Sequence, residues 1–105
     1  MIVHMAAFTW KPGVTSEQVA GLTRDLQAMA SAIPEVQRYT CGPALRIRDG
    51  IADFGVIAVL GAPEDVGTYL GHPLHQAVQA AWITDMVEDR RALQMSLPPE
   101  FLATR

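Results

Sequence analysis

The strongest constraint on the fold is the segment Phe54-Gly55-Val56-Ile57-Ala58-Val59-Leu60, which has the length of a β-strand and no polar side chain. Alternate residues of a strand point to opposite faces of its sheet. A strand with water on one side alternates apolar and polar residues, and this segment does not. We therefore expect both faces of its sheet to be covered.

Three further segments predict strands. Residues 2–10 place Ile2, His4, Ala6, Phe8 and Trp10 on one side and mostly apolar residues on the other. Residues 36–42 are rich in β-formers, and a last strand over 90–97 ends before two prolines. Residues 43–50 are polar and contain turn formers, so they predict a loop.

Helical patterns lie between these strands. Residues 15–18 have the form of a capping box, and apolar residues then recur at spacings of three and four up to Pro34. A short helix is predicted from Pro63, at N1, to Gly71, and a longer one from Pro73 that carries Trp82 and Met86.

The predicted order is strand, helix, strand, strand, helix, strand. This βαββαβ order indicates an α+β fold with one antiparallel sheet and helices on one face. The other face then needs a partner, and the apolar segment 54–60 favours a homodimer through that open face.

Length and composition limit the remaining possibilities. The 105 residues predict a single domain over 1–105, with 98–105 as a C-terminal tail. The net charge of −3, with acidic and basic residues mixed, argues against a nucleic-acid partner. No apolar run approaches the roughly 20 residues of a membrane span, no signal-like segment is recognised, and the one cysteine, Cys41, cannot form an internal disulfide. We expect a cytoplasmic protein.

The segment Tyr69-Leu70-Gly71-His72-Pro73-Leu74-His75 places a phenol and two imidazoles at a break between two helices. Gly71 suits a left-handed C′ position, and the following proline should keep His72 extended. His75 falls at N3 of the next helix, where the helix field disfavours an imidazolium. His75 is therefore a candidate catalytic base and Tyr69 a candidate proton donor.

Other residues are candidates for the surrounding pocket. His4, in the first strand, should face the same interior as Tyr69 and His75; it either orients a substrate carbonyl or bonds a buried backbone group. His72 is a second pocket candidate, although a structural cap that holds the helix break by hydrogen bonding is the favoured role for it. The candidate apolar walls, for each of which plain core packing is the favoured alternative, are Phe8, Leu26, Val56, Trp82 and Met86.

Alternatives to an acid–base site remain at the sequence level. Tyr69 could simply pin a helix to the sheet through its hydroxyl. The spacing His72-x-x-His75 would also suit a metal, but no Asp, Glu or Cys in the segment completes a ligand set, so neither a metal nor another cofactor is expected.

These residues resemble the stress-responsive α/β-barrel (Dabb) family over about 2–97. The resemblance rests on residues 3–14, on Ile33-Pro34-Glu35-Val36 and above all on Tyr-x-x-His-Pro-x-His at 69–75. It implies a ferredoxin-like protomer that forms a dimeric α+β barrel.

The resemblance also implies an activity. The best-defined enzyme of the family, plant olivetolic acid cyclase, closes a linear polyketide by aldol condensation without a cofactor. Its catalytic tyrosine and histidine match Tyr69 and His75, and two further histidines match His72 and His4. The chain departs from the family pattern at Leu60, where an aromatic residue is usual, and at Phe54, where several relatives have histidine.

Three functions follow as hypotheses. The first is a cofactor-free cyclase-like lyase or isomerase acting on a β-keto or aromatic compound. The second is a noncatalytic homodimer that binds a small apolar molecule or protects under stress. The third, which rests on fold similarity alone, is a cofactor-independent monooxygenase or haem-degrading enzyme.

Overall fold

One four-stranded antiparallel sheet forms the centre of the molecule, in a computed structural model that describes residues 1–50 and 52–103. The strands are β1 (Ile2–Trp10), β2 (Val36–Pro43), β3 (Phe54–Leu60) and β4 (Val87–Ser96), in the order β2-β3-β1-β4. The predicted order of elements is confirmed. The last strand begins three residues before the predicted start, since Val87 already pairs with Trp10.

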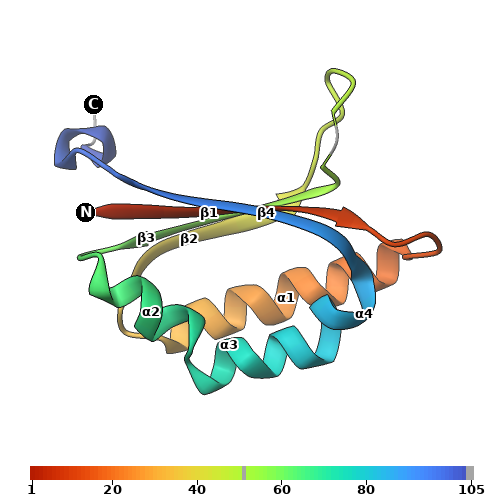
Figure 1. Cartoon of the computed structure of the whole chain (residues 1–105), viewed down its shortest axis with the longest axis horizontal. Coiled ribbons are helices and arrows are strands. Elements are labelled where there is room, and N and C mark those ends of the chain that lie inside the picture. The colour runs from red at the N-terminus through yellow and green to blue at the C-terminus, as the bar shows by residue number, and fades with distance from the viewer. Residues whose placement is uncertain (51, 104–105) are drawn as a thin grey trace.

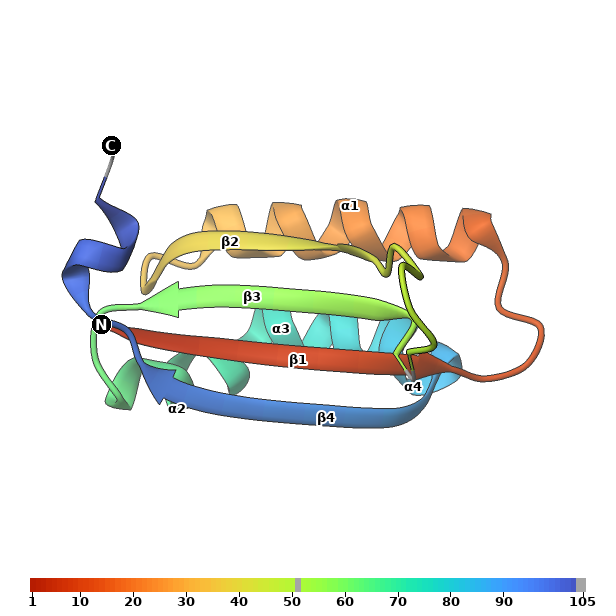
Figure 2. The same cartoon turned by 90° about the horizontal axis from the view of Figure 1, so that it is seen from above.

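The α-helices and the π-helical segment lie on one face of the sheet (Figure 1). They are α1 (Ser16–Ala32), α2 (Glu64–Leu70), α3 (Pro73–Val78), a π-helical segment η1 (Gln79–Ile83) and α4 (Thr84–Met86). Seen from the other side, the four strands are uncovered over most of their length (Figure 2). We call the uncovered side the open face.

The capping box predicted for α1 is present. The Thr15 hydroxyl accepts a hydrogen bond from the Gln18 backbone N–H at 3.2 Å, and the Gln18 side chain accepts from the Thr15 N–H at 2.9 Å. The helix stops at Ala32, with the next residue extended before Pro34. Pro63, predicted at N1 of the next helix, stands one position earlier, at its N-cap.

The main core fills the space between the sheet and the helices. Buried residues of α1 meet those of β1 and β3, and the largest fully buried side chains are Tyr69, Phe54, Leu22, Ile33, Leu60 and Met86. The predicted helical periodicity is thus confirmed where it faces the sheet. This core holds α1 and the α2–α3 pair at fixed positions over the strands.

The open face is only partly covered. At one end Val3, Val59 and Leu97 form a second buried cluster that Leu102 helps to cover. Leu102 belongs to a 3-10 turn, η2 (Pro99–Leu102), so the segment predicted as a tail folds back onto the sheet; its residues 104–105 lie outside the described residues. Elsewhere on this face Ile57 and Leu93 are exposed.

Among the described residues, no helix has both the length and the apolar character needed to cross a membrane.

Candidate active site

The break between α2 and α3 determines where the candidate residues lie. His72 has φ −64° and ψ 140°, the extended conformation predicted for a residue before proline. The left-handed conformation predicted for Gly71 is wrong, because its φ is −89°. A glycine nevertheless suits the position, since a Cβ there would lie 3.1 Å from the Gly67 carbonyl oxygen.

His72 acts within the break. Its Nδ1 accepts a hydrogen bond from the Leu74 N–H at 3.1 Å, so the imidazole caps the N-terminus of α3. It does not line the cavity described below, contrary to its place among the pocket candidates. The physical reason is that its ring turns toward the backbone of its own helix.

Tyr69 lies between the two other histidines. Its ring centroid is 5.0 Å from that of His75 and 5.8 Å from that of His4, and both contacts are edge-to-face. Tyr69 is 1% exposed and His4 is 5% exposed, whereas His75 is half-buried. Residues from β1, α2 and α3 therefore meet at one point, as the sequence predicts.

Burial favours the neutral forms of His75 and Tyr69. It lowers the pKa of His75, and the positive charges of a protonated His4 and of Arg90 lower it further, whereas a hydrogen bond with the Leu70 backbone acts in the opposite direction. Burial also raises the pKa of Tyr69, although an interaction with Tyr39 opposes this. At neutral pH the site thus combines an unprotonated imidazole with a protonated phenol.

His4 has a polar partner in the next strand. The register places His4 opposite Gln94, and the Gln94 amide donates to His4 Nδ1 at 2.7 Å. The partner is thus a side-chain amide and not the backbone group that was one of two alternatives. Burial first, and then Arg90, lowers the pKa of His4, so it accepts this hydrogen bond as a neutral ring with its proton on Nε2.

A cavity of about 320 Å³ opens beside these rings, between the sheet and α3. Three of the predicted walls, Phe8, Leu26 and Val56, line it. We call it the helix-side cavity. The other residues that line it are His4, Ala6, Tyr39, Tyr69, Leu70, His75, Gln76, Gln79, Ile83, Arg90, Ala92 and Gln94.

Trp82 and Met86 do not line this cavity, which corrects two of the predicted walls. Trp82 packs against α1, with its ring over Gly21, and its indole N–H donates to the Asp25 carboxylate at 2.8 Å. Met86 is 1% exposed and belongs to the main core. Both side chains pack helices against the rest of the core and lie outside the cavity.

The π-helical segment was not predicted from the sequence. It follows α3 directly, and the Thr84 backbone N–H and hydroxyl both reach the Gln79 carbonyl, the hydroxyl at 3.1 Å. Two of its residues, Gln79 and Ile83, line the cavity. Short π-helical insertions are common beside functional sites.

Tyr39 is a second phenol at the cavity that sequence reasoning missed. Its hydroxyl is buried and makes no hydrogen bond of normal geometry within the described residues, although it interacts with Tyr69. Burial strongly raises the pKa of Tyr39, so this hydroxyl is also protonated. The alternation of residues 36–42 does not distinguish the two faces of that strand, so it could not place Tyr39 at the cavity.

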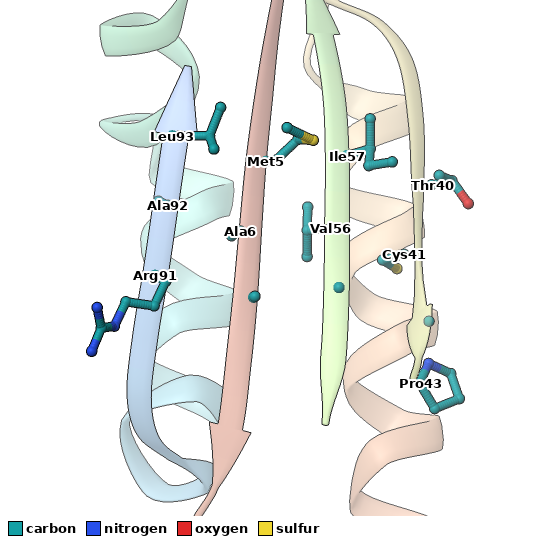
Figure 3. Close-up of a pocket in the computed structure, with 13 residues that line it drawn as sticks. Met5, Ala6, Thr40, Cys41, Pro43, Val56, Ile57, Arg91, Ala92 and Leu93 are labelled. Carbon is teal, nitrogen blue, oxygen red and sulfur yellow. The ribbon is translucent and has the colours of Figure 1, made fainter. Parts of the chain in front are cut away.

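A larger hollow lies on the opposite side of the sheet. It has a volume of about 570 Å³ and is lined by apolar residues of all four strands, such as Met5, Ile57 and Leu93 (Figure 3). Cys41 and Arg91 also line it, but no histidine or tyrosine does. Of these two hollows, only the helix-side cavity is lined by histidine and tyrosine side chains. Among the described residues, no three His, Cys, Asp or Glu side chains are grouped closely enough to hold a metal ion.

Comparison with known proteins gives the family. The model of the stress responsive A/B barrel domain (Dabb) matches residues 2–97, and the chain belongs to this family. A search of curated proteins finds no match.

Solved structures agree on the fold. A dimeric ferredoxin-like protein of unknown function from Thermobifida fusca is 38% identical, with a TM-score of 0.83 and coverage of 91% of this chain and 90% of that one. A hydroxynitrile lyase from Passiflora edulis is 13% identical, with a TM-score of 0.79 and coverage of 93% and 94%. An antibiotic biosynthesis monooxygenase is 12% identical, with a TM-score of 0.70 and coverage of 94% and 100%. The chain therefore has the ferredoxin-like fold, which is shared by proteins of different activities.

Proposed function

We propose that the protein is a cofactor-free lyase or isomerase that acts on a β-keto compound, in the manner of a polyketide cyclase. The observation that carries this proposal is the contact between His75 and Tyr69, 5.0 Å apart between ring centroids at the wall of a cavity lined by both apolar and polar side chains. A base and a protonated donor beside the same cavity are what enolisation of a ketone requires.

The reaction assigns one role to each residue. Neutral His75 removes a proton from the carbon between two carbonyls, and the Tyr69 hydroxyl donates a hydrogen bond to the oxygen on which negative charge develops. The enolate carbon attacks a second carbonyl of the same molecule and forms the new carbon–carbon bond. The proton held by His75 then returns to the alkoxide, so the step needs no oxidant and no cofactor.

His4 and Gln94 have a positioning role in this proposal. Their hydrogen bond leaves the Nε2–H of His4 free to donate to a substrate carbonyl. The lyase from Passiflora edulis supports the general class, because it shows that this fold can carry lyase chemistry. The monooxygenase shares the fold as well, and among the cavity residues no specific feature favours oxygen chemistry.

Proton exchange tests the reaction without the physiological substrate. The carbon next to the carbonyl of 1-phenylpropan-2-one exchanges its protons for deuterium slowly in D₂O, and NMR follows the loss of its signal. We expect the wild-type protein to accelerate this exchange, His75→Ala to lower the acceleration by about 10²–10⁴-fold, and Tyr69→Phe to lower it by a smaller factor.

A matched control uses the third histidine. His72→Asn removes an imidazole but keeps a residue that caps helices well, so it should leave exchange unchanged. If the wild type and His75→Ala exchange the ketone at equal rates while both bind it, the protein is the noncatalytic binder of the second hypothesis.

We further propose that the functional unit is a homodimer joined through the open face. Ile57, Leu93 and Met95 are 42%, 48% and 51% exposed there, around the 570 Å³ hollow. The loop after β2 and the turn η2 both rise above this face at opposite ends (Figure 1), and the loop carries Leu45 and Ile47 exposed. The relative from Thermobifida fusca is described as dimeric, which supports the same assembly here.

A further inference from the structure

The helix-side cavity carries one fixed charge. Among the described residues that line it there is no Asp, Glu or Lys, and Arg90 is the only Arg. The other ionisable groups are the two histidines and the two tyrosines, and burial favours the neutral form of each. The cavity is therefore electropositive at neutral pH, in a chain whose net charge is −3.

The strand register places Arg90 at this cavity. On β4, Arg90 lies opposite Phe8 of β1, and Gln94 lies opposite His4 of β1. Residues paired in this way point to the same face of the sheet. Because β4 is an edge strand and Arg90 is exposed, its side chain lies where the cavity meets solvent.

Arg90 has no carboxylate partner among the described residues. The ion pairs found there join Arg24 to Asp25, Arg46 to Asp53 and Arg91 to Asp89. The positive charge of Arg90 nevertheless acts on the buried site, because it contributes to lowering the pKa of both His4 and His75. An unpaired guanidinium at the mouth of a cavity without acids is suited to an anionic ligand.

We propose that Arg90 binds the carboxylate of the ligand, and that the ligand is accordingly a small β-keto or hydroxyaromatic acid. The guanidinium holds the carboxylate at the mouth, and the carbonyl or ring then reaches between Tyr69 and His75. This inference rests on the proposed function, since it names the substrate class of the same site. The volume of about 320 Å³ is at the lower end of ligand cavities, which fits a compact acid.

A pair of probe compounds isolates the charge. 2-Hydroxybenzoate and 2-hydroxybenzamide have nearly the same shape and differ in charge. We expect the wild type to bind the acid at least about tenfold more tightly than the amide, and Arg90→Gln to lose this preference while its affinity for the amide is unchanged. Arg90→Lys should keep part of the preference, because a lysine supplies charge without the two parallel hydrogen bonds.

Arg24→Gln is the matched control. It removes the same charge from an exposed arginine on α1 that does not line the cavity, so it should bind both compounds as the wild type does. Inorganic phosphate is a third probe; if it displaces 2-hydroxybenzoate at equal concentration, the site selects phosphate rather than a carboxylate and the proposed ligand class is wrong.

The outcomes separate this inference from the proposed reaction. Equal affinity for acid and amide, equal losses in Arg90→Gln and Arg24→Gln, or no binding of either compound at millimolar concentration would overturn the role of Arg90. Arg90-dependent binding in a protein that exchanges no ketone protons would support the anion site and remove the proposed reaction. His75-dependent exchange of the neutral ketone, in a protein that binds acid and amide equally, would do the reverse.

Discussion

Burial sets the protonation of the individual residues at the site. His75 and His4 lose hydration on folding, and this burial is the main reason why the pKa of each imidazole is lowered. Tyr69 keeps its proton for the corresponding reason, because burial disfavours the phenolate. The same residues would have ordinary properties in an unfolded chain, so their reactivity is a consequence of folding.

The lowered pKa values predict how stability depends on pH. The unfolded chain takes up protons on these histidines near the ordinary pKa of 6.5, before the folded protein does. Stability rises with pH wherever the unfolded state binds more protons. We therefore expect the free energy of unfolding to have its full value above pH 6.5 and to decrease as the pH drops below 6.5.

Urea unfolding at a series of pH values tests this dependence, with the double variant His4→Gln, His75→Gln as the comparison. The variant should show a shallower decline on the acidic side. An equally steep decline in both proteins would show that other groups cause the loss of stability.

At the scale of elements, the packing of α1 against η1 depends on a glycine. A Cβ at Gly21 would lie 2.5 Å from the Trp82 ring, and the Asp25 hydrogen bond holds that ring in place. Overpacking costs about 1–3 kcal/mol, more than the roughly 1 kcal/mol that alanine adds to helix stability. We expect Gly21→Ala to lower the free energy of unfolding.

Gly67 in α2 is the matched position, because nothing outside its chain neighbours and its own helix backbone lies within 4 Å of the Cβ that Gly67→Ala would add. That variant should be more stable than the wild type by up to about 1 kcal/mol. The two variants should therefore shift the midpoint of urea unfolding in opposite directions, and a rise for both would show that Trp82 does not constrain α1.

The strands and helices around the site also show which features the sequence predicts. The strands, the capped helix and the break at 71–73 follow from local patterns, and these brought Tyr69, His75 and His4 together. Arg90 and Gln94 were missed because they reach the cavity through the pairing of β1 with β4, which no local pattern specifies. Trp82 was misassigned because helical periodicity identifies a buried face and not the neighbour that covers it.

At the scale of the whole molecule, the open face predicts assembly. We expect light scattering to give about twice the protomer mass of 11.4 kDa. Ile57→Lys places a charge at the centre of the open face and should give the protomer mass, because an unpaired charge cannot be buried in an apolar interface without a large cost.

Leu74→Lys is the control for this experiment, since Leu74 is similarly exposed, at 40%, but lies on the helical side. It should remain a dimer. A mass of 11.4 kDa for the wild type at micromolar concentration would contradict the interface.

The central claim is that neutral His75 removes a proton from carbon, and the pH dependence of ketone exchange tests it most directly. Because burial and nearby positive charge lower the pKa of His75, the protein-catalysed rate should rise with pH to a plateau, with its midpoint below 6.5 and with no further rise near neutrality. The dependence should disappear in His75→Ala. A midpoint above 6.5, or an unchanged profile in that variant, would contradict the account.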